Sequence, residues 1–239
     1  MFIGDYHTHT NYSDGKGSVM DNALAAKQRG LKEIAVTDHA FHLLRKGLGK
    51  YFVLKAECEL AAQETGVKVL AGTEADIVSV KGEVDLSIQA LQEVEYLVVG
   101  FHKFAPPKSL SDFFKMYFVT YFNGLIPTSK KAIKRNTAAV VAAVERYPIK
   151  ALTHLNHSLK VDVGAVAAAC AKKGVLLEIN AKHLKDLKGQ WKALVESGAN
   201  FIINSDAHTP KEIGALQEAF QTAVKEGVSP NRIINYCGE

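Results

Sequence analysis

Two histidines at the end of the first apolar run could bind a metal ion. The segment DYHTHT places His7 and His9 two residues apart, and Asp14 follows in a glycine-containing turn. Alternate side chains of a strand face the same way, so both imidazoles would point to one face, together with Asp5. A histidine at a strand end is more often a hydrogen-bonded structural residue, so a metal site requires further ligands elsewhere in the chain.

Further residues of metal-ligand type end the later apolar runs. They are His39 in TDH, Glu74 in GTE, His102 in VGFH, His154 in LTH, and Asp206 with His208 in NSDAH. In a (β/α) barrel the carboxyl ends of the strands form the active-site face, so these side chains would meet those of the first run there. Purely structural residues would scatter along the elements instead.

The predicted ligand set contains imidazoles and carboxylates but no thiolate. Its nine members exceed the three that a catalytic zinc commonly takes, so we expect two or three divalent metal ions with a bridging carboxylate. Mixed histidine and carboxylate ligands favour Zn, Mn or Fe over Mg or Ca. Cys58, Cys170 and Cys237 lie far apart in the sequence, which predicts neither a disulfide framework nor a thiolate zinc site.

Short apolar runs alternate with helical patterns along the chain and would position these ligands. The runs cover residues 2–7, 33–39, 67–77, 95–102, 150–157, 175–180 and 200–208, and helices are expected at 18–30, 51–65, 163–173, 187–197 and 211–226. Each run is rich in Val, Ile or Leu, which is typical of strands covered on both faces. The repetition predicts an α/β fold, a seven-stranded (β/α) barrel that forms a single domain over residues 1–239.

The segment at about 104–136 is longer than an ordinary connection and is predicted to be a helical, aromatic-rich insertion. Its aromatic residues are Phe113, Phe114, Tyr117, Phe118, Tyr121 and Phe122, and its cations are Lys130, Lys131, Lys134 and Arg135. A buried helix, or a contact between subunits of a homo-oligomer, is the favoured interpretation of the aromatic residues. A lid whose cations attract a phosphate is the alternative.

The composition favours a cytoplasmic protein. The densest apolar run, FFKMYFVTYF, is far shorter than the roughly 20 residues that span a bilayer, so we expect no membrane association. The net charge of +4 fits an anionic substrate. Without an extended basic tail, charge alone does not favour nucleic acid as a partner.

The motifs DYHTHTNYSDG, AVTDH, GTEADI, VGFH, LTH, LEIN and NSDAH occur in this order and extend over nearly the whole chain. Together they resemble the polymerase and histidinol phosphatase (PHP) family of metal-dependent phosphoesterases. The resemblance implies a distorted, TIM-like seven-stranded barrel with a trinuclear metal centre. It implies one ion bound by His7, His9, Glu74 and Asp206, a second by Glu74, His102 and His154, and a third by Asp14, His39 and His208.

Two segments depart from the pattern of this family. Many relatives have Pro and Gly after the histidine of the fifth strand, whereas this chain reads THLNHSLK, which makes His157 a candidate substrate contact. Phosphatase-type relatives can carry an arginine for the substrate phosphate near the EIN motif, and here Lys182 or Lys185 would substitute as a point charge. A solvated surface lysine is an equally good interpretation of each.

The predicted activity is hydrolysis of small phosphate monoesters, such as histidinol phosphate or a nucleotide, by a hydroxide that bridges two metal ions. No nucleophile motif surrounds Ser13 or Ser205, so a covalent intermediate is not expected. Asp5 and Asp38, next to ligands, are candidates to orient the imidazoles, and a structural role in a turn or cap is an equally good interpretation of each. The alternatives are a phosphodiesterase that trims nucleic acid ends, an amidohydrolase-type C–N hydrolase, and a scaffold protein with a relic metal site.

Overall fold

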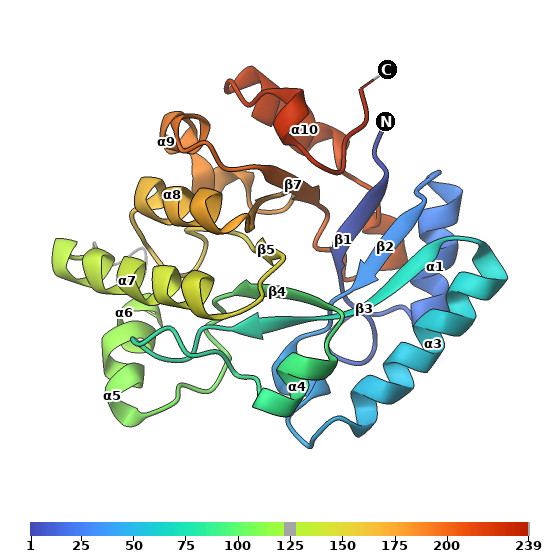
Figure 1. The fold of residues 1–239 in the computed structure, drawn as a ribbon, viewed down its shortest axis with the longest axis horizontal. Helices are drawn as coiled ribbons and strands as arrows, with labels where there is room; N and C mark the ends of the chain where they lie inside the picture. The colour runs from blue at the N-terminus through green and yellow to red at the C-terminus, as the bar shows by residue number, and fades with distance from the viewer. Residues whose placement is uncertain (122–127, 239) are drawn as a thin grey trace.

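Seven parallel strands form a nearly closed barrel, in the order in which they occur along the chain (Figure 1). They are β1 (Gly4–Thr8), β2 (Glu33–Val36), β3 (Lys68–Asp76), β4 (Tyr96–Gly100), β5 (Ala151–Leu152), β6 (Leu176–Asn180) and β7 (Phe201–Asn204). The computed structural model describes residues 1–121 and 128–238, without the side chains at positions 119 and 121. The predicted α/β barrel of seven strands is confirmed.

The barrel is distorted because its longest strand, β3, changes partners along its length. Residues 68–71 of β3 pair with β2, whereas residues 72–76 pair with β4. The first and last strands approach each other just beyond their ends, where the backbone amide of His9 donates to the carbonyl oxygen of Ala207 at 2.8 Å. This contact closes the carboxyl end of the barrel, where predicted ligands from both strands lie.

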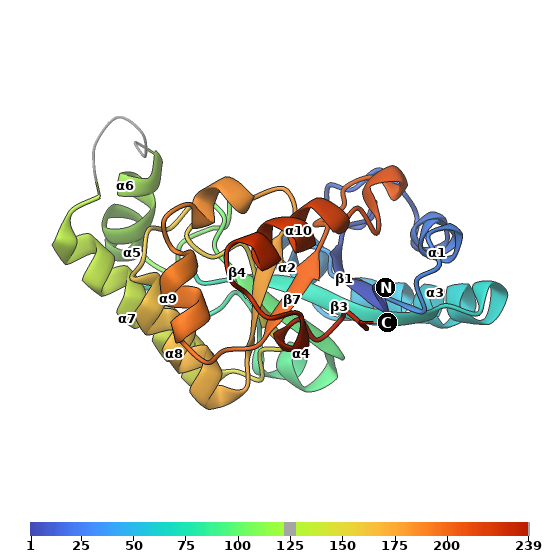
Figure 2. The same ribbon diagram turned by 90° about the horizontal axis from the view of Figure 1, so that it is seen from above.

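Helices surround the barrel and connect its strands (Figures 1 and 2). They include α1 (Val19–Gln28), α2 (Ala40–Leu43), α3 (Gly49–Thr65), α4 (Ile88–Glu93), α7 (Lys130–Arg146), α8 (Val163–Lys173), α9 (Trp191–Glu196) and α10 (Gln217–Lys225). Ser18 caps α1 by accepting from the backbone amide of Asp21, and Gly66 ends α3 in a left-handed conformation. The last two helices are shorter than predicted, because 3₁₀ turns at Leu184–Leu187 and Pro210–Glu212 precede them.

The segment after β4 is helical in the part that the structure describes. It comprises α5 (Leu110–Asp112), a π-helical turn (Phe113–Tyr117) and α6 (Phe118–Tyr121), at one end of the molecule (Figure 2). Tyr117 is buried against Phe101, with ring centroids 4.8 Å apart, whereas Phe114 and Phe118 are 55% and 46% exposed. Phe122 and the side chain of Tyr121 lie outside the described residues. A subunit contact or a lid formed by this segment stays a prediction.

A packed core holds the strands in place beneath the ligands. Val98, Ala151 and Ile202, from β4, β5 and β7, form a small cluster of their own, and larger apolar clusters fill the layer between strands and helices. Such close packing fixes the strand ends that carry the site. No helix within residues 1–121 and 128–238 is long and apolar enough to cross a membrane.

Candidate metal centre

The nine predicted ligands meet at the carboxyl end of the barrel. His7 lies in β1 and Glu74 in β3, and the others follow strand ends: His9 and Asp14 after β1, His39 after β2, His102 after β4, His154 after β5, and Asp206 and His208 after β7. Each has a side-chain nitrogen or oxygen within 4 Å of a side chain of opposite type in the set. The structure therefore brings all nine together, as expected from their positions at strand ends.

Glu74 occupies the centre of the group and is 1% exposed. Around its carboxylate, at 2.9–3.8 Å, lie imidazole nitrogens of His7, His9, His39, His102 and His154. One oxygen, Oε2, is 3.2 Å from both Nε2 of His7 and Nδ1 of His39. The other, Oε1, is 2.9 Å from Nε2 of His154. Because its two oxygens face different imidazoles, this carboxylate is placed to bridge two cations.

Asp206 and Asp14 extend the group towards solvent. Oδ1 of Asp206 is 3.4 Å from Nε2 of His9 and 3.4 Å from Nδ1 of His208. Oδ2 of Asp14 is 3.4 Å from Nε2 of His208, and its Oδ1 is 3.7 Å from Nε2 of His39. The Asp14 side chain is 50% exposed, against 8% for Asp206. The group is thus enclosed at His7 and Glu74 and open at Asp14.

The unpartnered buried atoms of the group fit bound cations. Nε2 of His7, both ring nitrogens of His9, and Oε2 of Glu74 are buried and have no hydrogen-bond partner among the described residues. Such atoms cost about 1–3 kcal/mol each unless something satisfies them. Zinc bonds to nitrogen and oxygen of about 2.0–2.2 Å in tetrahedral geometry separate the ligand atoms by about 3.3 Å. The 3.2–3.4 Å distances from His7 to Glu74 and from His9 to Asp206 match this spacing.

The electrostatics of Glu74 and His9 favour the protonation states that bind metal, whereas, against the effect of burial, nearby carboxylates raise the pKa values of the imidazoles of His7, His39, His102 and His208 in the ion-free protein. Burial penalises the charged form of Glu74, but the opposing charges of His7, His102 and His154 outweigh it and hold its pKa well below the usual range. Burial lowers the pKa of His9 to about 4. An ionised carboxylate and a neutral imidazole at neutral pH are the forms that act as ligands.

Two carboxylates that the sequence analysis did not select orient the imidazoles. Nδ1 of His7 is 2.7 Å from Oε1 of Glu178, a distance at which the ring N–H donates to the carboxylate and leaves the Nε2 lone pair facing Glu74. Nδ1 of His102 is likewise 2.9 Å from Oδ1 of Asp76. Glu178 lies in the LEIN motif, and Asp76 lies two residues after Glu74, on the same face of β3.

Of the two roles considered for Asp5 and Asp38, the hydrogen bonds support the structural one and not the orientation of imidazoles. Asp5 accepts hydrogen bonds from the backbone amides of Ser205 and Gly214, at 3.0 and 2.9 Å. Asp38 accepts from the backbone amide of Thr10 at 2.9 Å and from the Ser13 hydroxyl at 2.5 Å. Both carboxylates therefore act on backbone and hydroxyl groups of the loops that carry ligands, and they fix those loops instead of the rings.

Two of the ligands occupy strained backbone conformations. His154 and Asp206 have positive φ angles of 25° and 54°. Residues other than glycine adopt such backbone conformations at a cost of about 1–3 kcal/mol. Gly100, at the end of β4, makes room for one of the two ligands, because a Cβ atom there would collide with the Thr153 hydroxyl and the His154 ring. Strain of this kind persists where surrounding structure imposes a functional geometry.

A cavity of about 430 Å³ opens over the ligands. Beside five of them, its lining includes Phe41, Phe104, His157 and His183. Phe104 is 87% exposed and offers apolar surface at the cavity. His157 is one of the predicted substrate contacts and His183 is not, although His183 and Asp186 have a spacing that can bind metal in a helical turn.

The two predicted lysine contacts lie outside this cavity. Its described lining includes neither Lys182 nor Lys185. Nζ of Lys182 is 3.2 Å from Nδ1 of His208 and 3.2 Å from Oε2 of Glu212, at the rim of the site. Lys185 is exposed on the 3₁₀ turn after β6. Lys182 is therefore the better placed of the two to meet an anionic substrate.

Comparison with known proteins agrees with the site and the fold. The PHP domain model matches residues 5–182, and the chain belongs to this family. A probable phosphatase of Vibrio parahaemolyticus is 30% identical over 97% of this chain and 88% of the relative. One of Shewanella pealeana is 29% identical over 100% of this chain and 90% of the relative. The resemblance deduced from the motifs is thus confirmed.

A solved structure with the same fold is histidinol phosphate phosphatase from Lactococcus lactis, complexed with zinc, L-histidinol and phosphate. It superposes with a TM-score of 0.64 at 18% identity, over 95% of this chain and 94% of that chain. At this identity the likeness concerns the fold, and it confirms the distorted barrel that the family resemblance implies.

Proposed function

We propose that this protein is a metal-dependent phosphatase that hydrolyses small phosphate monoesters. The observation that carries the proposal is the cage of buried imidazoles around Glu74, with ligand atoms that lack hydrogen-bond partners in the described part of the chain. Membership of the PHP family and the naming of two similar proteins as probable phosphatases support it. The zinc, histidinol and phosphate in the Lactococcus lactis structure support the same chemistry.

The nine side chains would hold three divalent ions of Zn, Mn or Fe. In this assignment His7, His9, Glu74 and Asp206 hold the first, Glu74, His102 and His154 the second, and Asp14, His39 and His208 the third. Bound there, the ions would supply Lewis-acid stabilisation of the phosphate and an activated water for attack on phosphorus. Glu74 is the shared ligand in this assignment, which agrees with the imidazole nitrogens that lie close to both of its carboxylate oxygens.

The residues of the chain itself bind and orient, and none is assigned as a nucleophile. The described lining of the cavity contains no serine, threonine or cysteine side chain. The Ser13 hydroxyl donates to Asp38 and thereby stabilises the loop after β1. Glu178 and Asp76 fix the rings of His7 and His102, so that the ligand atoms keep their direction when substrate enters.

The cavity fits a small organic phosphate. Its volume of about 430 Å³ lies within the range of roughly 300–1,000 Å³ that small-molecule sites occupy. Phe41 and Phe104 offer apolar surface beside the charged ligands, which suits a leaving group with a planar or apolar part. Lys182 at the rim and His157 in the wall remain candidates to contact the substrate.

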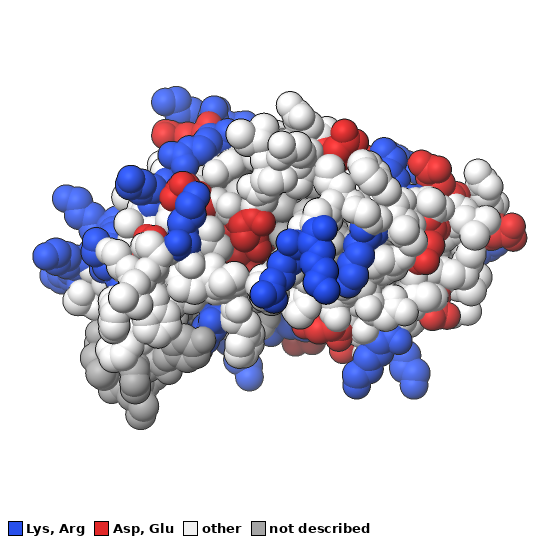
Figure 3. All heavy atoms as spheres, turned by 90° about the horizontal axis from the view of Figure 1, so that it is seen from below, with Lys and Arg blue, Asp and Glu red and all other residues white. Residues whose placement is uncertain are grey.

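Hydrolysis of nucleic acid ends remains the principal alternative. It would need cations spaced along a groove with stacking aromatic residues. On the face drawn in Figure 3, the described Lys and Arg side chains form separate groups with acidic and uncharged residues between them, not one continuous track. A location in the cytoplasm stays a prediction.

A substrate panel tests the proposal. Purified protein loaded with Zn, Mn or Fe is assayed for phosphate release from 4-nitrophenyl phosphate, histidinol phosphate and nucleoside monophosphates, beside a single-stranded DNA digestion and an assay of C–N hydrolysis with amide substrates. We expect release from monoesters and little cleavage of DNA. Cleavage of DNA alone would establish the phosphodiesterase, C–N hydrolysis without phosphate release would establish the amidohydrolase, and inactivity of the fully metal-loaded protein throughout would favour a scaffold.

A further inference from the structure

A second group of metal-ligand side chains lies in the wall of the cavity, outside the nine ligands. It consists of His157, from the loop after β5, with His183 and Asp186, from the turn after β6. One ligand atom from each lies within 4.8 Å of the others. His157 and His183 line the cavity, and all three residues are partly buried.

We infer that these three residues form a separate binding site for a transition-metal ion such as Zn²⁺. Oδ2 of Asp186 is 2.7 Å from Nδ1 of His157 and 3.7 Å from Nδ1 of His183. In the ion-free protein Nδ1 of His157 is hydrogen-bonded to Asp186, and a bound ion would replace that proton and separate the two atoms to the roughly 3.3 Å of ligands on a tetrahedral zinc. The two rings face each other with centroids 3.8 Å apart, so both can turn a nitrogen towards one point.

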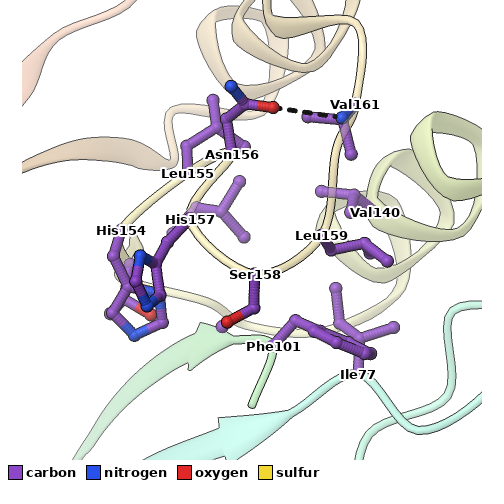
Figure 4. A pocket seen from close by; sticks show the side chains of 13 residues that line it. Ile77, Phe101, Val140, His154, Leu155, Asn156, His157, Ser158, Leu159 and Val161 are labelled. Carbon is purple, nitrogen blue, oxygen red and sulfur yellow. Dashed lines mark hydrogen bonds between the residues drawn. The ribbon is translucent and has the colours of Figure 1, made fainter. Parts of the chain in front are cut away.

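The surrounding structure holds the two loops in register for this site. Asn156, with a left-handed φ of 67°, donates from Nδ2 to the carbonyl oxygen of Asp186 at 3.1 Å. Its Oδ1 accepts from the backbone amide of Val161 at 3.3 Å, as the dashed line in Figure 4 shows. The backbone amide of Asp186 donates to the carbonyl oxygen of His183 at 3.0 Å. Asn156 therefore links the loop of His157 to the turn that carries the other two ligands.

The site adjoins the metal centre without sharing its ligands. The rings of His157 and His183 lie 5.8 and 5.7 Å from that of His154, centroid to centroid, and Figure 4 shows His154 and His157 side by side. Nε2 of His183 is 3.7 Å from Oδ2 of Asp206. Three protein ligands leave a position open on the ion. Since two of them line the cavity, that position can accept an anionic or neutral donor of a bound molecule, so His157 would contact a substrate through the ion.

Counting the bound metal tests this assignment independently of any activity. Protein stripped with a chelator is titrated with Zn²⁺ against a chromophoric competitor, for the wild type, Asp186→Asn, His157→Ala and the control His42→Ala. His42 lines the same cavity and belongs to none of the groups of ligands. We expect each of the first two variants to bind one equivalent fewer than the wild type, and the control to bind the wild-type number.

The wild-type number of bound ions in both Asp186→Asn and His157→Ala would overturn the site. The loss of more than one ion from a folded variant would also overturn it, because these residues would then belong to the metal centre. Circular dichroism establishes that each variant is folded. A second measurement avoids variants altogether: anomalous scattering at the zinc edge from wild-type crystals should give a peak among His157, His183 and Asp186. The lack of such a peak at saturating zinc would also overturn the inference.

Discussion

Nδ1 of His7 lies 2.7 Å from Oε1 of Glu178, across 171 residues of sequence. Glu178 is buried and also accepts from the backbone amide of His154 at 2.8 Å and from the side chain of Asn204 at 2.9 Å. One carboxylate thus fixes two ligands, the ring of the first and the backbone of the second.

Glu178→Gln should weaken metal binding while leaving all nine ligands in place. The amide cannot accept from every donor that the carboxylate serves, so the imidazole of His7 loses its fixed tautomer. Loss of such a partner typically costs about 10- to 100-fold in metal affinity or activity. Zinc titration of the variant measures the effect, with Glu64→Gln, at an exposed position of α3, as the control. Unchanged affinity in Glu178→Gln would contradict the orienting role.

Gly100→Ala should disturb the site through packing alone. The added methyl group collides with Thr153 and His154, and overpacking of this kind costs about 1–3 kcal/mol. We expect a lower free energy of unfolding in urea, together with weaker zinc binding. Gly49→Ala is the matched control, since a Cβ atom there meets open space. Equal stability and zinc affinity in the two variants would show that the close approach at β4 is unimportant.

Phe104→Ala should raise KM for aromatic phosphates more than it lowers kcat. The exposed ring lines the cavity beside the ligands, and an aromatic contact is worth about 0.5–1.5 kcal/mol, or about 2- to 13-fold in KM. Steady-state kinetics with 4-nitrophenyl phosphate measures this. Phe114→Ala, an exposed aromatic residue outside the cavity lining, should leave KM unchanged. A fall in kcat with unchanged KM would indicate that the Phe104 ring acts in the chemical step and not in substrate binding.

Metal affinity should fall as the pH is lowered. Burial opposes a charge on His102, but Glu74 and Asp76 outweigh it and raise its pKa to about 10 in the ion-free protein. A proton and a metal ion therefore compete for this ring, and binding at neutral pH releases protons. Zinc titrations between pH 6 and 8, in buffers with different ionisation enthalpies, measure the release. Affinity that is independent of pH would be inconsistent with imidazole ligation.

The sequence was sufficient to predict the barrel and its nine candidate ligands, because both depend on local patterns. Residues such as His39 and His154 follow apolar runs, and parallel strands bring the carboxyl ends of such runs to one face. The family resemblance added the division into three ions. Predicting the barrel and the nine ligands did not require knowledge of which side chains touch across the barrel.

The orienting carboxylates could not be predicted in the same way. Asp5 and Asp38 stand beside ligands in the sequence, yet they bind loop backbone and hydroxyl groups. Glu178 reaches His7 from β6, and this contact depends on the tilt and stagger of the closed barrel. A buried acidic residue within an apolar strand, as in LEIN, was the only local signal, because such a charge requires a partner.

The most direct test of the central claim joins metal analysis to phosphate release for the wild type, His9→Ala and Asp206→Ala. We predict three ions of Zn, Mn or Fe at the nine ligands of the active wild type, beside the one inferred at His157, His183 and Asp186. In both variants we predict loss of bound metal and of turnover by more than the roughly 100-fold that removal of an orienting partner produces. A folded variant that keeps its metal and its full rate of phosphate release would contradict the central claim.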